Sequence, residues 1–183
     1  FVQQGSETYD KAYLSDNGLV AVQKDGRWAI LDEDLQQVTE YRFTDVAVNS
    51  KGQVFYGNYA VVADEGGYYL IDKAGEAWFE ERFADAKGIE EGLFAVADSS
   101  GRWGFANEKG ELVVDYQYED AYSFSNRLAA VKYAGNWGYV NKYGTMVIEA
   151  QFQQAWPFLA GSSLVTDDLG NYKVLKLKYY SLF

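Results

Sequence analysis

The chain has 183 residues, of which 48% are hydrophobic, and a net charge of −11 from 27 acidic and 16 basic side chains. It contains no Cys and no His, which excludes disulfides, thiol nucleophiles, Cys/His zinc sites and catalytic triads that need histidine. The negative charge argues against a nucleic-acid partner, and no apolar run is long enough to span a membrane.

Aromatic residues and glycines dominate the rest of the composition. The chain has 16 Tyr, 11 Phe, 5 Trp and 18 Gly, but a single Pro. Aromatic side chains favour strands, and glycines favour the tight turns between them. The composition therefore predicts an all-β protein of many short strands.

A short pattern recurs along the chain: a few apolar residues, a polar turn with Gly, and an aromatic residue two positions after that Gly. It first occurs as Leu19–Val22 followed by Gly26 and Trp28. The aromatic positions of the successive copies are Trp28, Tyr68, Trp103, Trp137 and Tyr172, spaced by 40, 35, 34 and 35 residues. A fixed period of this length is the signature of a repeat architecture.

A second pattern keeps step with the first: an aromatic residue, two mostly polar residues, then Ala or Val. Its copies are Tyr9–Ala12, Phe43–Val46, Phe83–Ala86, Tyr118–Ala121 and Phe152–Ala155. We therefore predict one repeat domain over residues 1–183. Its units lie at approximately 9–42, 43–82, 83–117, 118–151 and 152–183.

Each unit of about 35 residues is predicted to be an antiparallel β-meander. From the third unit onward, strands are expected at 93–97, 102–107, 111–115 and 117–124, joined by Gly-containing hairpin turns. The repeated Trp or Tyr is interpreted as a core ladder, with a ligand-stacking platform as the alternative. Gly104, after Trp103, is expected to leave room for the next unit's backbone or for a neighbouring ring.

Two segments resemble a known family. Trp103-Gly104-Phe105 with Lys109-Gly110, and Trp137-Gly138-Tyr139 with Gly144, resemble the bacterial WG-containing (KWG-like) β-repeat family. The resemblance covers nearly the whole chain. Three units lack the family's Gly after the aromatic position and have Ala29, Tyr69 and Lys173 there. The resemblance implies a β-rich repeat used for structure or binding, without a general catalytic site.

Five such units could form a propeller-like ring or an open β-superhelix. A ring would close by pairing the two ends of the chain, which protects strand edges. An open stack would bury each unit against its neighbours. Lys176 and Lys178 near the last expected strand are typical of an exposed strand edge. Both arrangements stay open from the sequence.

Repeat proteins often bind through their departures from the repeat, and two departures stand out. The second unit has six extra residues within 48–58, around Phe55 and Tyr56. The fifth unit has two extra positions near Trp156-Pro157-Phe158. If exposed, Phe55, Tyr56, Trp156 and Phe158 could bind a ligand; otherwise the segments are a decorated turn and a packed end cap.

No constellation of catalytic or metal-ligating residues emerges, so we expect no enzyme, no metal and no cofactor. Runs of adjacent carboxylates such as residues 32–34 lack the spacing of a calcium loop. The predicted function is a protein-interaction scaffold, in a bacterial surface or secreted protein according to the resemblance and to the first residue, Phe1, in place of Met. The alternatives are a carbohydrate or cell-wall binder that uses exposed aromatics, and a carboxylate glycosidase with a central funnel.

Overall fold

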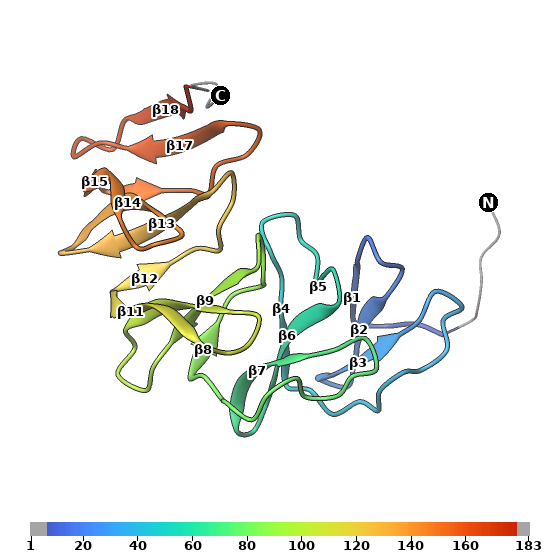
Figure 1. Ribbon diagram of the computed structural model, residues 1–183. Helices are drawn as coiled ribbons and strands as arrows, with labels where there is room; N and C mark the ends of the chain where they lie inside the picture. Colours follow the sequence, from blue (N-terminus) through green and yellow to red (C-terminus); the bar gives the residue numbers. More distant parts are fainter. Residues whose placement is uncertain (1–6, 179–183) are drawn as a thin grey trace, which may run out of the picture.

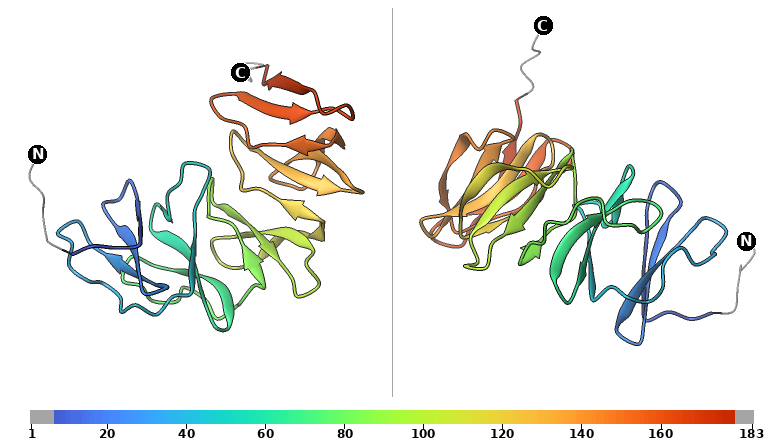
Figure 2. Two further views of the ribbon diagram at one scale, coloured as in Figure 1. Left: turned by 180° about the vertical axis from the view of Figure 1, so that it is seen from behind. Right: turned by 60° about the horizontal axis from the view of Figure 1, so that its bottom comes forward.

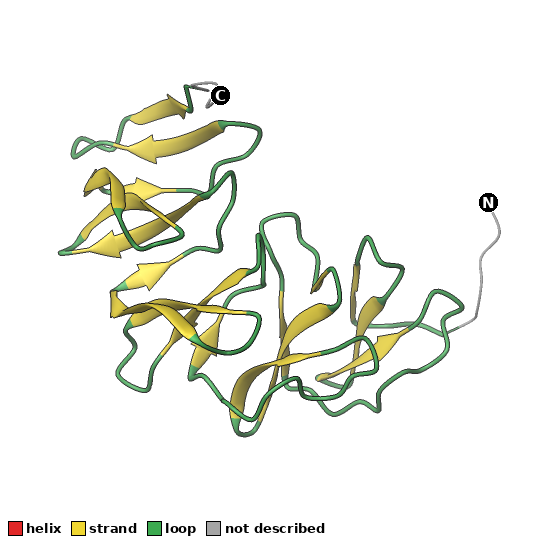
Figure 3. Cartoon of the chain, in the orientation of Figure 1, coloured by secondary structure: helices red, strands yellow, loops and turns green. Residues whose placement is uncertain are grey.

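The computed structural model describes residues 7–178, which form eighteen strands in five sheets with antiparallel pairing throughout. This part of the chain contains strands, turns and loops only (Figure 3), so it offers no helix that could cross a bilayer. The strands are β1 (Lys11–Leu14), β2 (Val20–Lys24), β3 (Arg27–Leu31), β4 (Asp45–Ala47), β5 (Phe55–Tyr56), β6 (Tyr59–Asp64), β7 (Gly67–Ile71), β8 (Asp85–Ala86), β9 (Leu93–Ala97), β10 (Trp103–Asn107), β11 (Leu112–Tyr118), β12 (Asp120–Ala121), β13 (Leu128–Tyr133), β14 (Asn136–Asn141), β15 (Met146–Phe152), β16 (Gln154–Ala155), β17 (Ser162–Thr166) and β18 (Tyr172–Lys176).

The five sheets stand one after another along an open arc (Figure 1). The sheet β1-β2-β3 lies at one end of the arc and β16-β17-β18 at the other, as both views in Figure 2 show. Within residues 7–178 no strand of the first sheet pairs with the last. The described chain is therefore an all-β array of propeller-like sheets that leaves the ring open.

The predicted meander is confirmed in its central strands. The expected strands at 93–97 and 102–107 correspond to β9 and β10, which pair antiparallel in register Gly104↔Val96. The expected strands at 111–115 and 117–124 are wrong in their bounds: β11 runs on to Tyr118, and β12 has only two residues. The reason is that β11 completes the third sheet, whereas β12 already pairs with β13 in the fourth.

Gly104 and Gly138 allow the fourth strand of their own sheet to pass close to the third. A Cβ on Gly104 would lie 2.5 Å from the carbonyl oxygen of Val114 in β11, and one on Gly138 would lie 2.6 Å from that of Ile148 in β15. The pairing of β10 with β11 and of β14 with β15 is irregular at these glycines, as at a β-bulge. The expected neighbour, the next unit's backbone or a ring, is thus corrected to the strand of the same sheet.

Where the glycine is missing, the fourth strand is not continuous. In the first unit, Ala29 stands at this position and the following segment makes only isolated bridges, such as Trp28↔Phe43. In the second unit the position is Tyr69. The Arg82 guanidinium lies over the Tyr69 ring, 3.6 Å from its centroid. A continuous, bulged fourth strand is thus found in the third and fourth units, which have the glycine.

The hydrophobic core is divided into layers between neighbouring sheets. Because each internal sheet is covered on both sides, both faces of strands such as β10 are buried. Residues Phe43 and Phe55 lie in the layer between the first and second sheets, and Tyr139 and Phe158 in the layer between the fourth and fifth. The outer side of the first sheet has its own small cluster, covered by Tyr9, Val20 and Tyr41.

Hairpin turns are held by Asp or Asn side chains that accept backbone N–H groups two and four residues later. In the last hairpin, the Asp167 Oδ1 accepts the N–H of Leu169 and of Asn171 at 3.0 and 2.9 Å. The Lys173 ammonium lies 3.1 Å from the other carboxylate oxygen. The Asn171 backbone N–H and the Lys173 ammonium lower the pKa of Asp167 to about 2.

The stabilising contribution of Asp167 to this turn should be lost at low pH. The charged carboxylate is favoured by the fold, so its stabilising contribution is complete above the ordinary pKa of an aspartate, near 3.8, and is lost as the pH falls through about 2. An NMR titration of the side-chain carboxyl carbon should give a midpoint near 2. In an Asp167→Asn variant, the acid-induced loss of stability between these two pH values should be smaller. A midpoint at the ordinary value would contradict the hydrogen-bonded turn.

Candidate functional site

One repeated position, the residue that follows the Ala or Val of the second sequence pattern, lines a hollow of the arc in the third, fourth and fifth units. In the five units it is Tyr13, Ala47, Lys87, Tyr122 and Trp156. Where its side chain is long, it packs on the aromatic residue of the first pattern in the same unit. Tyr122 and Trp137 have ring centroids 5.3 Å apart, and the Lys87 ammonium lies 4.6 Å from the Trp103 ring.

The repeated aromatic residues themselves are mostly core, as the ladder interpretation predicted. Trp28, Trp103 and Trp137 are only 3%, 7% and 8% exposed. Tyr172 differs, because it is 68% exposed and contacts Trp156 with ring centroids 6.0 Å apart. Most of the repeated aromatic rings are therefore closed off from solvent, and the half-buried partner of Tyr172, Trp156, lies one position after Ala155.

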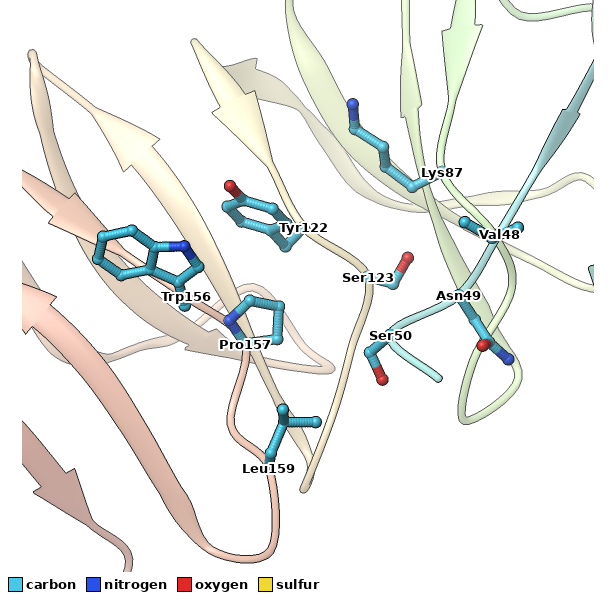
Figure 4. A pocket seen from close by; sticks show the side chains of 9 residues that line it. All are labelled: Val48, Asn49, Ser50, Lys87, Tyr122, Ser123, Trp156, Pro157 and Leu159. Carbon is cyan, nitrogen blue, oxygen red and sulfur yellow. The ribbon is translucent and has the colours of Figure 1, made fainter. Parts of the chain in front are cut away.

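The repeated residues Lys87, Tyr122 and Trp156, together with residues 48–50 of the second unit, surround one hollow of about 370 Å³ (Figure 4), which we call the inner groove. Because four successive sheets of the arc contribute to it, the groove lies on the concave side. Its lining residues are Val48, Asn49, Ser50, Lys87, Tyr122, Ser123, Trp156, Pro157 and Leu159. Figure 4 shows Trp156, Tyr122 and Pro157 along one wall, opposite Val48 and Lys87.

The extra loop of the second unit reaches the groove because the third unit makes room for it. A Cβ on Gly88 would lie 2.3 Å from the backbone nitrogen of Asn49, so only glycine permits this approach. The buried carboxylate of Glu90 accepts hydrogen bonds from the hydroxyl and backbone N–H of Ser50. Ser123 in turn donates to the Gly88 carbonyl at 2.6 Å, so the second, third and fourth units are tied together at the groove.

The groove combines apolar surface with a few polar groups. Trp156, Pro157 and Leu159 supply rings and aliphatic surface, and Lys87 supplies an ammonium group held over Trp103. Burial, followed by the charge of Asp120, raises the pKa of the Tyr122 hydroxyl, which therefore stays protonated and can donate a hydrogen bond. No carboxylate is among the lining residues.

Two of the four predicted ligand-binding residues are placed in the core. Phe55 is 2% exposed and its N–H donates to Ser15 Oγ at 3.1 Å, which holds the extra hairpin against the first unit. Phe158 is fully buried, with its ring centroid 4.9 Å from that of Tyr139. The prediction that Phe55 and Phe158 bind a ligand depended on their exposure, and this condition is not met. The alternative, packed segments, holds for these two rings, because the layers between sheets take large apolar side chains from the inserted segments.

The other two predicted residues reach solvent but do not meet. Trp156 lines the inner groove, whereas Tyr56 lines a second hollow of about 870 Å³ with Glu91, Arg127 and Tyr143. What the structure does bring together is the start of the first inserted segment, 48–50, and the Trp156-Pro157 pair. The two departures from the repeat thus converge on one site.

Sequence reasoning missed Lys87, Tyr122 and Ser123, which lie in regular units. Their signal was available in the repeat register: Lys87 and Tyr122 occupy the same position as Trp156, directly after Ala86, Ala121 and Ala155. Residues at the same position of successive units lie on the same side of the arc. Their side chains should therefore be considered together as one possible binding surface. As to metals, no group of three potential metal-ligating side chains occurs in residues 7–178.

Comparison with known families gives a match to the family model described as WG containing repeat. The matched segments are residues 8–28, 103–137 and 137–162. They include both Trp-Gly pairs, at 103–104 and 137–138. No curated protein matches the sequence.

Solved structures share the fold at low identity. Hsv2p from Kluyveromyces lactis is 13% identical, with a TM-score of 0.60, covering 96% of this chain and 64% of that one. BamB from Moraxella catarrhalis is 17% identical, with a TM-score of 0.55, covering 91% and 58%. Both are β-propellers. The chain thus spans about three fifths of the length of each, and at these identities the likeness shows the fold alone.

Proposed function

We propose, from the match of three segments to the WG containing repeat family, that this chain is a non-catalytic protein-interaction module that binds a peptide segment of a partner in the inner groove. The observation that carries the proposal is the convergence of both departures from the repeat, residues 48–50 and Trp156-Pro157, on one groove. Following the sequence resemblance, we place the module in a bacterial surface or secreted protein.

The lining selects the kind of peptide. Aromatic and aliphatic surface from Trp156, Pro157 and Leu159 favours apolar side chains, which give most of the affinity in peptide grooves. The Lys87 ammonium is a fixed positive group in a chain of net charge −11. It favours a carboxylate in the peptide, so the expected ligand is an extended segment with apolar residues next to an Asp or Glu.

The absence of carboxylates from the groove lining supports a non-catalytic role over the glycosidase alternative. Glycoside hydrolysis needs a pair of carboxyl groups on either side of the scissile bond. The groove residues of the described chain include none. The proposal therefore relies on binding through rings, an ammonium group and hydroxyls.

The test is to pan a random peptide library on the immobilised chain and to titrate the selected peptide by tryptophan fluorescence. Selected sequences should combine apolar residues with Asp or Glu, and a Trp156→Ala variant should bind them at least ~30-fold more weakly. Trp78→Ala is the matched control, because Trp78 is half-exposed, contacts Tyr59 and lines neither hollow. It should bind like the parent chain.

Three outcomes would contradict the proposal. The library could yield no saturable ligand, or the selected peptide could bind the Trp156→Ala variant unchanged. The third outcome is a saturable fluorescence change with soluble cell-wall polysaccharide, but not with peptides, that is lost in Trp156→Ala. That result would replace the peptide by a glycan. Circular dichroism of each variant checks that it is folded.

A further inference from the structure

The second hollow, of about 870 Å³, shares no lining residue with the inner groove. Buried Phe124 gives it apolar surface, and Tyr56 and Tyr143 give it aromatic rings with hydroxyl groups. Two basic side chains, Arg127 and Lys142, also line it. The second hollow therefore combines ring surface and positive charge in a chain whose net charge is −11.

The strand register sets the two basic residues opposite each other. β13 and β14 pair antiparallel, and their ladder ends with the pair Leu128↔Asn141. The next residues outward on the two strands are Arg127 and Lys142. Like charges in opposite positions of a strand pair repel each other. No salt bridge between residues 7–178 includes either cation, so the repulsion is not relieved by such a pair there.

Other units have glycine and an acid at the same step of the register. In the first unit, a Cβ on Gly18 would lie 3.3 Å from the Cβ of Glu33. In the third unit, a Cβ on Gly92 would lie 3.8 Å from the Oε1 of Glu108. Residues at this step are therefore close neighbours, and the fourth unit replaces glycine and acid by two cations.

Arg127 also has a backbone conformation that favours glycine. Its φ is +67°, in the left-handed region. The equivalent residues of the first, third and fifth units are Gly18, Gly92 and Gly161, with φ of +84°, +77° and +75°. An arginine in this region is strained, since its Cβ approaches the backbone. Strain and like-charge repulsion thus coincide at one residue of the second hollow, and such unfavourable features cluster at functional sites.

Hydrogen bonds hold both basic residues in place. The Glu91 carboxylate oxygens accept the backbone N–H of Arg127 at 3.2 and 2.9 Å. The Asn141 Oδ1 accepts the backbone N–H of Tyr143 at 3.0 Å, which fixes the turn that carries the second cation. Glu91 also lines the second hollow. Its charge offsets one of the two cations, so an excess of one positive charge remains among the lining residues.

We propose that the second hollow binds an anionic sugar, either a uronic acid or a sugar phosphate, with its carboxylate or phosphate group between Arg127 and Lys142. An oxyanion at this place removes the repulsion between the cations, and a guanidinium can hold two of its oxygens. The sugar ring packs on Tyr143, which is 75% exposed, and the tyrosine hydroxyls hydrogen-bond to the sugar hydroxyls. The volume of the hollow suits a ligand of this size.

Isothermal titration calorimetry with glucuronate and with glucose 6-phosphate tests the site. Both should bind saturably, whereas glucose, which lacks the anionic group, and inorganic phosphate, which lacks the ring, should each bind at least ~10-fold more weakly. Lys142→Gln should weaken both sugar anions at least ~10-fold, and Tyr143→Ala should weaken them about fivefold. Lys73→Gln is the matched control, because Lys73 has the same position in the turn of the second unit and does not line the second hollow. It should leave binding unchanged.

Arg127→Gly separates loss of binding from loss of folding. Glycine is already the residue at this position in three other units. The variant should bind both sugar anions at least ~10-fold more weakly, because one of the two cations is gone. At the same time it should unfold at a higher urea concentration than the parent chain, because the strain and the repulsion are removed.

The proposal is overturned if neither sugar anion binds saturably, or if Arg127→Gly and Lys142→Gln both leave the affinity unchanged. Glucose that binds as tightly as its anionic derivatives would also overturn it, as would inorganic phosphate that binds as tightly as glucose 6-phosphate. An equal loss in Lys73→Gln would reduce the effect to net charge and would overturn the site as well. A preference for glucuronate supports a uronic acid as the ligand, and a preference for glucose 6-phosphate supports a sugar phosphate.

Discussion

Replacing Gly104 by alanine is expected to destabilise the protein by about 2–3 kcal/mol, although alanine is the better strand residue in general. The added Cβ would lie 2.5 Å from the Val114 carbonyl oxygen and 3.0 Å from the Asp115 carbonyl carbon. Both atoms belong to the backbone of β11, so no side-chain rotation relieves the contact. Either β11 separates from β10 or the sheet distorts.

The measurement is urea unfolding followed by circular dichroism and tryptophan fluorescence. Gly138→Ala should behave like Gly104→Ala, because its Cβ would lie 2.6 Å from the Ile148 carbonyl oxygen. The matched control is Ala29→Gly, the reverse change at the same repeat position in the first unit, where no continuous fourth strand passes. It should cost only about 0.5–1 kcal/mol, the ordinary cost of a glycine in a strand. Equal losses in Gly104→Ala and Ala29→Gly would contradict the close-strand explanation.

Replacing Gly88 by alanine is expected to open the inner groove and to weaken peptide binding at least ~10-fold, with a stability loss of about 1–3 kcal/mol. The Cβ would lie 2.3 Å from the Asn49 nitrogen and 2.3 Å from the Val48 carbonyl carbon. The 48–50 loop must therefore move away from the third unit. The hydrogen bonds from Ser50 to Glu90 should be lost with it.

Gly101→Ala separates the loss of binding from a general loss of stability. Gly101 has a φ of +78° in a hairpin turn, and a Cβ there would meet nothing within 4 Å. Alanine at this angle is strained and should cost about 1 kcal/mol, while peptide affinity stays unchanged because Gly101 is not part of the groove. An unchanged affinity in Gly88→Ala would show that the loop does not shape the site.

Much of the architecture could be predicted from local patterns. The period of the repeat, the strands around 93–97 and 102–107, and the burial of Trp28, Trp103 and Trp137 all follow from alternating apolar residues and Gly-containing turns. These features depend on residues close together in the sequence, so the sequence carries them directly. The WG family resemblance pointed to the same fold.

The candidate site could be predicted only in part. Trp156 and the inserted segment at 48–58 were found as departures from the repeat. The burial of Phe55 and Phe158 could not be predicted, because a sequence does not distinguish an exposed aromatic in a loop from one that fills a layer between sheets. The role of Gly104 was seen as a need for space, but the atom that fills it, the Val114 carbonyl oxygen, comes from an irregular strand pairing.

The sequence by itself determined that the protein is a repeat of β-meanders and which positions recur in each unit. Only the tertiary structure decided that the five sheets of residues 7–178 form an open arc, and that Val48, Lys87, Tyr122 and Trp156 meet in one groove. The reason is that strands and turns depend on short-range geometry, whereas curvature adds up from the packing of one sheet on the next. Small angles between neighbouring sheets, summed over the array, place residues far apart in sequence side by side.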